Sequence, residues 1–539
     1  MRLKRIRSAL LLLLAAVTAV FASGCTDSGE MVLFRDIADR VTALRLNRGQ
    51  VSVYVDGEEA RTEGLYMAPD LRLWLPASQL NDLLCCSTAW VGTTGVSLRR
   101  GDAATSLSLD EEGRADLTEA ARALGFQYSF DVKQARADLL SPPEAEEELP
   151  ARYDLREHGR TTGVRDQRSW GTCWAFASTS ALESALLPDQ KWDFSEDHLV
   201  NKSGVSTGMD DGGDHTMALA YFASWRGPVT EEEDPYGDGV SPDSAKAAVH
   251  VQDAVFLRDR DFDQIKRLVS TYGEVQTSIY ASPYYDELLN YYNEDTASYY
   301  YTGSAGCNHE IDIIGWDDNY SRENFLSQPE RDGAFLCKNS WGEYFGDNGY
   351  FYISYCDKQI GSEGCAYTGV EPADNYGNIY QDDLLGWSGS TGYNSPSACF
   401  AAVYQARGQE DLKAVSFYAT GPDTWYDIYL VPAFEGVEDF DSKKILQSGY
   451  LPEAGYFTIP LEQSQALAAG RKFALIIDIR TEGAQQPVAL EYQKNPAAEN
   501  ADLSDGETYM SNDFQTWTRL EDKTGGNACL KAFTDPRQQ

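Results

Sequence analysis

Cys173 is the residue in this sequence whose surroundings best suit a nucleophile. It lies in the stretch "DQRSWGTCWAFAS", residues 166–178, between a Gly-Thr pair and a run of good helix formers. A thiol attacks well once it ionises, and ionisation is favoured at a helix N-terminus and beside a cationic histidine. Alone, this stretch would suit an inert, buried cysteine at the base of a helix better than a nucleophile. The two interpretations differ in one respect: a nucleophilic cysteine needs a general base, a group that orients this base and a donor for the oxyanion elsewhere in the chain.

Three further residues have the types that acyl transfer through a thiol requires. His309, in "GCNHEIDIIGWDDNY", is a general base for the thiol. Asn339, in "KNSWG", offers an amide oxygen that accepts the imidazole N–H and fixes its tautomer, and Trp341 can shield that bond from water. Gln167, on the loop before Cys173, offers an amide N–H that joins the backbone N–H of Cys173 as donor to an oxyanion.

The sequence pattern also predicts the elements that hold these residues. Residues 173–187 are rich in Ala and Leu, which predicts a helix that begins at the cysteine and stops at Pro188. Gly171 before it lets the backbone turn sharply. Small residues precede His309, and apolar residues alternate after it, which predicts a strand that starts at the histidine.

These residues together resemble the papain family of cysteine peptidases. In that family a His and an Asn follow the cysteine by roughly 130–150 residues. His309 follows Cys173 within this range, and Asn339 follows slightly beyond it. The motif "NSWG" at 339–342 and the segment "FSEDHLV" at 194–200 match the family in the same order. The resemblance implies a Cys173–His309–Asn339 triad with Gln167 at the oxyanion.

The resemblance also implies a substrate-binding strip and reveals two departures. Gly212 and Gly213 match the stretch whose backbone pairs with an extended peptide, and we expect them, with Trp341, to contact substrate. Where the family has Gly after the oxyanion glutamine, this chain has Arg168. Trp170 replaces the disulfide cysteine that precedes the nucleophile, so that family disulfide is absent.

The N-terminus predicts export. Basic residues, an apolar run of about a dozen residues and then small residues form a secretion signal too short to span a membrane with margin. Cys25 follows Ala-Ser-Gly, which resembles a bacterial lipoprotein signal in which the cysteine is acylated. We therefore expect a lipid anchor on Cys25, although Ala22 stands where such signals usually have Leu.

The chain divides into five parts by composition and periodicity. The fold class expected is multidomain α+β: a papain-like fold with a helical lobe and a β-rich lobe, followed by an all-β sandwich and preceded by a small mixed domain. The sandwich resembles the lectin-like domain of exported bacterial members of the family, and its strands are expected to fold alone. The predicted parts are a signal peptide (1–24), a small stalk-like domain (25–140), a linker (141–150), a peptidase domain (151–372) and a lectin-like β-sandwich (373–539).

The net charge and the cysteine content limit the kinds of ligand and partner that the chain is expected to bind. A formal net charge of −39 repels nucleic acid and anionic lipid, so we expect neither as a partner beyond the lipid anchor. No pair of cysteines has zinc spacing, and we expect no metal and no organic cofactor. Cys356 and Cys365 are close enough in sequence to pair, without further support. A monomer that acts on peptides or proteins is expected.

The function predicted is that of an exported, cell-surface cysteine endopeptidase that works through an acyl-enzyme. Two alternatives stay open at this point. A transpeptidase would use the same acyl-enzyme with a different acceptor. A surface adhesin would keep the peptidase domain only as a scaffold.

Overall fold

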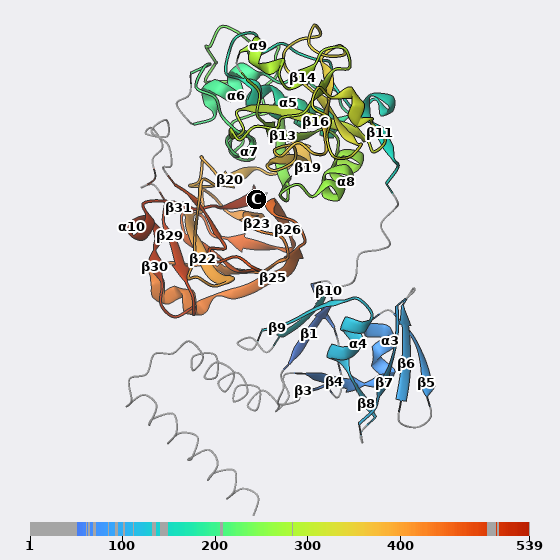
Figure 1. The fold of residues 1–539 in the computed structure, drawn as a ribbon. Coiled ribbons are helices and arrows are strands. Elements are labelled where there is room, and N and C mark those ends of the chain that lie inside the picture. The colour runs from blue at the N-terminus through green and yellow to red at the C-terminus, as the bar shows by residue number, and fades with distance from the viewer. Residues whose placement is uncertain are drawn as a thin grey trace, which may run out of the picture. The chain divides into compact units, whose positions relative to one another are not determined.

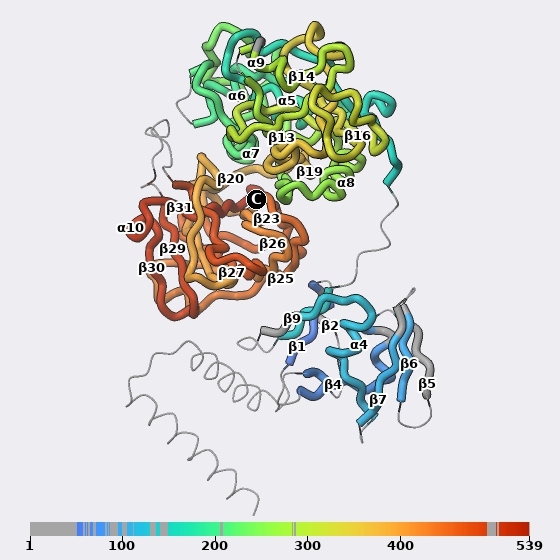
Figure 2. Tube along the Cα trace, in the orientation of Figure 1, coloured from blue at the N-terminus to red at the C-terminus, as the bar shows by residue number. Residues whose placement is uncertain are grey.

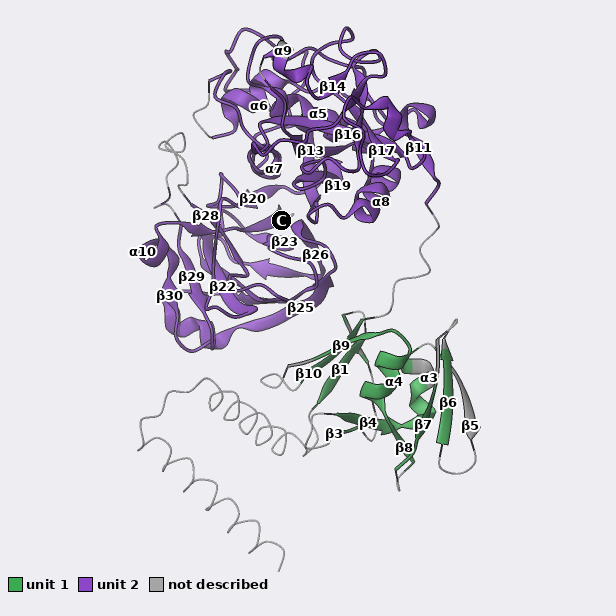
Figure 3. Cartoon of the chain, in the orientation of Figure 1, with its two compact units in different colours: residues 1–146 green, residues 147–539 purple. Residues whose placement is uncertain are grey.

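The computed structural model describes residues 51–537, apart from short gaps between residues 56 and 135 and at 141–148, 205–207, 283, 493–502, 504 and 505. The chain forms two compact units, residues 1–146 and 147–539 (Figure 3). The predicted signal peptide, Cys25 and most of the predicted linker lie outside the described residues.

The first unit is a small α/β module. Its strands form the sheets β2-β1-β10-β9, β3-β4-β8 and β5-β6-β7. Val53 and Leu75 are among its fully buried residues. Its elements are β1 (Ser52–Val55), β2 (Glu58–Ala60), β3 (Tyr66–Met67), β4 (Leu73–Pro76), α3 (Leu80–Leu83), β5 (Ser87–Val91), β6 (Gly95–Arg100), β7 (Ala103–Ser108), β8 (Arg114–Asp116), α4 (Leu117–Ala123), β9 (Gln127–Asp131) and β10 (Arg136–Leu140).

The second unit begins with a half rich in helices. The predicted nucleophile helix is confirmed as α5 (Cys173–Leu186), which is buried on almost every side. Two later helices begin at side-chain caps: Ser195 accepts the His198 N–H, and Asp214 accepts the N–H groups of Thr216 and Met217. These and the remaining helices are α6 (Glu196–Lys202), α7 (His215–Ala223), α8 (Phe262–Tyr272) and α9 (Tyr285–Leu288).

A β-rich half follows, in the strand order β14-β15-β18-β17-β16-β13-β19-β12, with β11 on β16. The predicted strand after His309 is confirmed as β16, but its residues from 309 to 316 are all buried because α5 and α8 pack against it. The strands are β11 (Arg152–Asp154), β12 (Val249–Phe256), β13 (Val275–Ile279), β14 (Tyr292–Asn293), β15 (Ser298–Tyr299), β16 (His309–Asp317), β17 (Ala334–Lys338), β18 (Tyr350–Ser354) and β19 (Gly364–Pro372).

The C-terminal segment is a β-sandwich, as its period of two predicts (Figure 1). A six-stranded sheet, β25-β24-β27-β22-β29-β30, packs against strands β26, β23 and β32 over one large apolar core. The elements are β20 (Asn378–Tyr380), β21 (Gly389–Thr391), β22 (Ser397–Gln405), β23 (Glu410–Ala419), β24 (Thr424–Val431), β25 (Lys444–Leu451), β26 (Gly455–Leu467), β27 (Lys472–Thr481), β28 (Val488–Glu491), β29 (Thr508–Ser511), β30 (Thr518–Arg519), α10 (Leu520–Thr524), β31 (Asn527–Ala528) and β32 (Leu530–Pro536).

One sheet runs through both halves of the second unit. Strand β12 pairs with β19 on one side and with β26 of the sandwich on the other, so that the 13-stranded sheet continues into the C-terminal segment. Figure 2 traces the chain through the segments that carry β19 and β26. Tyr418, Tyr456 and Cys529 of the sandwich lie in the same apolar cluster as Val251 and Tyr367. The two segments therefore share part of a core, and the prediction that the sandwich folds alone stays a prediction.

Two further observations concern export and cysteine chemistry. Among the described residues, no helix is long and apolar enough to cross a membrane. Cys356 and Cys365 are both free thiols, so the open suggestion that they pair is not supported by the structure.

Candidate active site

Cys173 is the first residue of α5, and its surroundings force the backbone close together. A Cβ on Gly171 would come within 2.9 Å of the Asp210 carbonyl oxygen, so a larger residue there would displace this loop. The first helical bond is donated by the Ala175 N–H to the Thr172 carbonyl oxygen at 2.9 Å. The N–H of Cys173 therefore precedes the helical ladder and is free for an oxyanion.

The electrostatics of Cys173 differ from the expectation that the helix start favours a thiolate. Burial raises the pKa of the Cys173 thiol to about 11, and the neighbouring Glu310 carboxylate adds to this rise. The backbone N–H groups of the helix start and of Glu310 act in the opposite direction but do not outweigh burial. A thiolate at this position consequently needs a cationic partner, and His309 is the candidate.

His309 and Asn339 are brought together at neighbouring strand ends. His309 opens β16, and Asn339 follows β17, which pairs with β16. The imidazole Nε2–H donates to Asn339 Oδ1 at 2.8 Å, because an amide oxygen can only accept. Nδ1 is left to accept a proton from the thiol. Burial lowers the pKa of His309, and the Trp341 ring stacks on the imidazole with centroids 4.7 Å apart.

Gln167 is held between the nucleophile loop and the end of β17. Its Oε1 accepts from the Ser340 hydroxyl at 2.6 Å, and its Nε2 donates to the Trp170 carbonyl oxygen at 2.7 Å. One N–H of the amide remains for an oxyanion. Arg168 next to it has φ +59°, a left-handed conformation that Gly adopts without cost, which explains why Gly suits this position.

The two glycines expected to contact substrate lie directly before α7. Gly212 has φ +75°, and a Cβ on Gly213 would overlap the ring of Trp174, the residue after the nucleophile. Only Gly at 213 thus allows the strip to lie against the start of α5. Trp341 stacks on His309, as described above, and the structure contains no substrate against which to test its predicted contact.

Two residues next to this site were missed by the sequence analysis. Glu310 follows His309 and is only 5% exposed, and His215 follows the Gly212–Gly213 strip and is 8% exposed. His215 Nδ1 lies 3.8 Å from Glu310 Oε1. The one sequence signal for Glu310 is its position as an acidic residue in a segment whose apolar pattern predicts a buried strand. No local sequence feature indicates that it lies next to His215.

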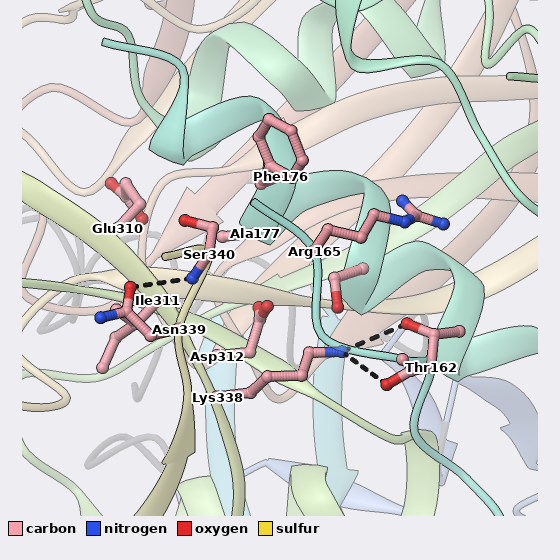
Figure 4. A pocket seen from close by; sticks show the side chains of 12 residues that line it. Thr162, Arg165, Phe176, Ala177, Glu310, Ile311, Asp312, Lys338, Asn339 and Ser340 are labelled. Carbon is pink, nitrogen blue, oxygen red and sulfur yellow. Dashed lines mark hydrogen bonds between the residues drawn. The ribbon is translucent and has the colours of Figure 1, made fainter. Parts of the chain in front are cut away.

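A cavity of about 20 Å³ lies between α5, β16 and the end of β17, and Glu310, Asn339 and Ser340 are among the residues that line it (Figure 4). Lys338 reaches across it to Thr162 and bonds Glu274 Oε1 at 2.7 Å, and the Ser180 hydroxyl of α5 donates to Glu274 Oε2 at 2.6 Å. The carboxyl groups that line the cavity are those of Asp312 and Glu310, and burial raises the pKa of Asp312 well above its usual range. This network ties α5 to β17, the strand that ends next to Asn339.

Comparison with known families assigns two regions of the chain. Residues 149–370 match the "Papain family cysteine protease" model, and residues 379–534 match the "Lectin like domain" model. Cathepsin L of Sarcophaga peregrina is 32% identical over 225 residues, covering 39% of this chain and 61% of that protein. A viral cathepsin of Adoxophyes honmai nucleopolyhedrovirus is 27% identical over 220 residues, covering 40% of this chain and 60% of its own. The chain thus spans about 60% of the length of these relatives.

Among solved structures, two of the clostridial cysteine protease Cwp84 extend the similarity over both regions. One, determined after propeptide cleavage, is 29% identical with a TM-score of 0.64 and covers 72% of this chain and 99% of that one. The other contains the cysteine protease and lectin-like domains of Cwp84, described as a surface layer associated protein of Clostridium difficile. It is also 29% identical with a TM-score of 0.64, and covers 74% of this chain and 91% of its own.

Proposed function

We propose that the chain, whose residues 149–370 match the papain family cysteine protease model and whose residues 379–534 match the lectin-like model, is an exported cysteine endopeptidase of the bacterial cell surface. The single observation that carries the proposal is the 2.8 Å bond from His309 Nε2 to Asn339 Oδ1, which leaves Nδ1 unengaged by Asn339 and able to serve as a base. No metal or organic cofactor takes part in the proposed reaction.

The proposed reaction proceeds in two halves. His309 Nδ1 takes the thiol proton while Cys173 Sγ attacks the scissile carbonyl carbon, and the oxyanion is held by the Cys173 N–H and the free N–H of Gln167. Collapse breaks the C–N bond as His309 protonates the leaving amine. Water then attacks the thioester, His309 again serves as base, and the acid product leaves with the thiol restored.

The proposed location rests on two independent supports. The N-terminal sequence has a secretion signal with Cys25 at the position of lipoprotein acylation. Cwp84, similar to this chain over both domains, is described as surface layer associated. We propose that the mature protein is tethered by a lipid on Cys25, with peptide or protein substrates, and that it acts as a monomer. A mass spectrum of the membrane fraction tests for acylated Cys25.

The nucleophile is tested by Cys173→Ala in the full chain, with Cys356→Ala as the matched control because Cys356 is also a partly exposed free thiol. We expect no peptide hydrolysis from the first variant, unchanged hydrolysis from the second, and the same melting curve for both. Hydrolysis that survives Cys173→Ala would contradict the mechanism. Product analysis with an added amine acceptor distinguishes hydrolysis from transpeptidation, which uses the same acyl-enzyme.

A further inference from the structure

Glu310 is a buried carboxylate beside the proposed nucleophile, and the triad makes no use of it. It follows His309 in β16 and acts electrostatically on the Cys173 thiol. Its hydrogen bonds come from neutral groups of β13: the Ser278 hydroxyl donates to Oε1 at 2.7 Å, and the Gln276 amide donates to Oε2 at 3.1 Å. A carboxylate has about four acceptor positions, so these bonds leave capacity for another donor.

His215 lies close to Glu310, but the two side chains do not form a hydrogen bond. Its Nδ1 lies 3.8 Å from Glu310 Oε1, beyond hydrogen-bond distance, and is a buried polar atom without a hydrogen-bond partner. Burial by itself lowers the pKa of His215, but the Glu310 carboxylate outweighs it and the pKa is raised. His215 thus leaves acceptor capacity on the buried Glu310 carboxylate unused, and this points to a further cationic donor that completes the set.

The groups around this pair are acidic. Asp214, the exposed cap of α7, and Glu363, exposed just before β19, both act electrostatically on His215. Glu363 also acts on Cys307, two residues before His309, where it adds to the burial that raises the pKa of that thiol to about 11. The carboxylates of Glu310, Asp214 and Glu363 outnumber the single imidazole of His215, so this region has a negative potential that attracts a positively charged side chain.

The substrate would pass this region. His215 lies two residues after Gly213, which packs on Trp174 next to the nucleophile. An extended peptide on the Gly212–Gly213 strip therefore has a side chain close to both His215 and Glu310 when its carbonyl carbon reaches Cys173.

We propose that Glu310, together with His215, forms the base of a specificity pocket that selects a lysine or arginine side chain in the part of the substrate that precedes the scissile bond. The inference rests on the proposed peptidase function and adds its substrate class. A bound cation would also offset the negative charge beside Cys173, so that the correct substrate favours the thiolate that attacks it.

The first test measures kcat/KM for peptide pairs that differ only by Lys, Arg, Leu or Glu at one position before the cleaved bond. The full-length protein is expected to prefer a basic residue at one such position. Glu310→Gln is expected to reduce this preference roughly 10- to 100-fold, the range for one charge-assisted hydrogen bond. Glu438→Gln, the same change at an exposed site in the C-terminal segment, is expected to leave the preference unchanged.

The second test follows alkylation of Cys173 by iodoacetamide against pH, which requires no peptide. Glu310→Gln is expected to move the midpoint to lower pH, because it removes a charge that opposes the thiolate. Hydrolysis without basic preference in the unmodified protein, or an unshifted midpoint in folded Glu310→Gln, would overturn the inference and leave the peptidase proposal standing. A protein that cleaves no peptide of any kind would instead overturn the proposed function.

Discussion

At the residue scale, the reactivity of Cys173 is a balance between burial, a neighbouring carboxylate and a histidine. Burial raises the thiol pKa and lowers the pKa of His309, so each group alone is held neutral. The charged pair forms only if the two titrate together, since each ion stabilises the other. The helix start contributes donors, but it does not decide the protonation state.

The variant His309→Ala should show how strongly burial and Glu310 raise the pKa of Cys173 when the imidazole is absent. Without the imidazole, burial and Glu310 still raise the pKa of Cys173 against the weaker effect of the backbone N–H groups, so the thiolate is present only at alkaline pH. We expect the alkylation rate of this variant to rise through a midpoint above the ordinary thiol pKa, whereas the unmodified protein reacts at lower pH. An alkylation midpoint at or below the ordinary thiol value in His309→Ala would show that the helix start suffices.

Gln167→Ala should lower turnover by roughly 10²–10³, the range for the loss of one oxyanion donor. Alkylation of Cys173 should change far less, because that reaction builds no oxyanion. Ser340→Ala is the matched control, since it removes the hydroxyl that holds Gln167 Oε1 but keeps the donor. If alkylation falls in parallel with turnover, or turnover is unaffected, Gln167 is structural and another donor serves.

At the element scale, α5 is tied to β17 by a buried ion pair as well as by apolar packing. Lys338 and Glu274 are 5% and 0% exposed, and Glu274 also accepts from Ser180 of α5. A buried pair of this kind adds little net stability over an apolar pair, but breaking it leaves an uncompensated charge. The network therefore fixes the distance between the nucleophile helix and the strand end that carries Asn339.

Lys338→Met should reduce the free energy of unfolding by about 3–5 kcal/mol, because the Glu274 carboxylate is left buried and unpaired. The double variant Lys338→Met/Glu274→Met should recover much of this loss, since no charge remains. Urea denaturation of the two variants and of Glu274→Met completes the cycle. Strictly additive losses would mean that the two side chains do not interact.

At the scale of the whole molecule, the peptidase and lectin-like segments form one unit because β12 pairs with β26. Ala254 faces Tyr456 in this register, and the two segments share an apolar cluster. We infer that the lectin-like segment supports the sheet on which the peptidase half is built, whatever else it binds.

Gly455→Val should weaken the pairing between β12 and β26. A Cβ at Gly455 would overlap the carbonyl oxygen of Ala254, and overpacking of this kind costs about 1–3 kcal/mol. We expect calorimetry of the full chain to show a separate transition for the sandwich, whereas Gly408→Ala, with only an ordinary contact at 3.7 Å, should not. Unchanged cooperativity in Gly455→Val would mean that the shared sheet does not couple the segments.

Several helices, strands and candidate site residues of this protein could be predicted from local sequence patterns. The helix at Cys173, the strand at His309 and the all-β character of the C-terminal segment were predicted because helix and strand periodicities and breakers act within a few residues. Candidate triad residues were found because each stands in a short motif. The fold class followed from the same local signals.

Only the tertiary structure decided which distant groups meet. The pairing of Glu310 with His215, the anchoring of Gln167 by Ser340 and the join of β12 to β26 all bring together residues far apart in the chain. Such contacts depend on strand register and on how helices pack over the sheet, and no local period encodes either. The sequence by itself determined which residues have chemistry to offer, and the packing determined their charge, their partners and the substrate they would select.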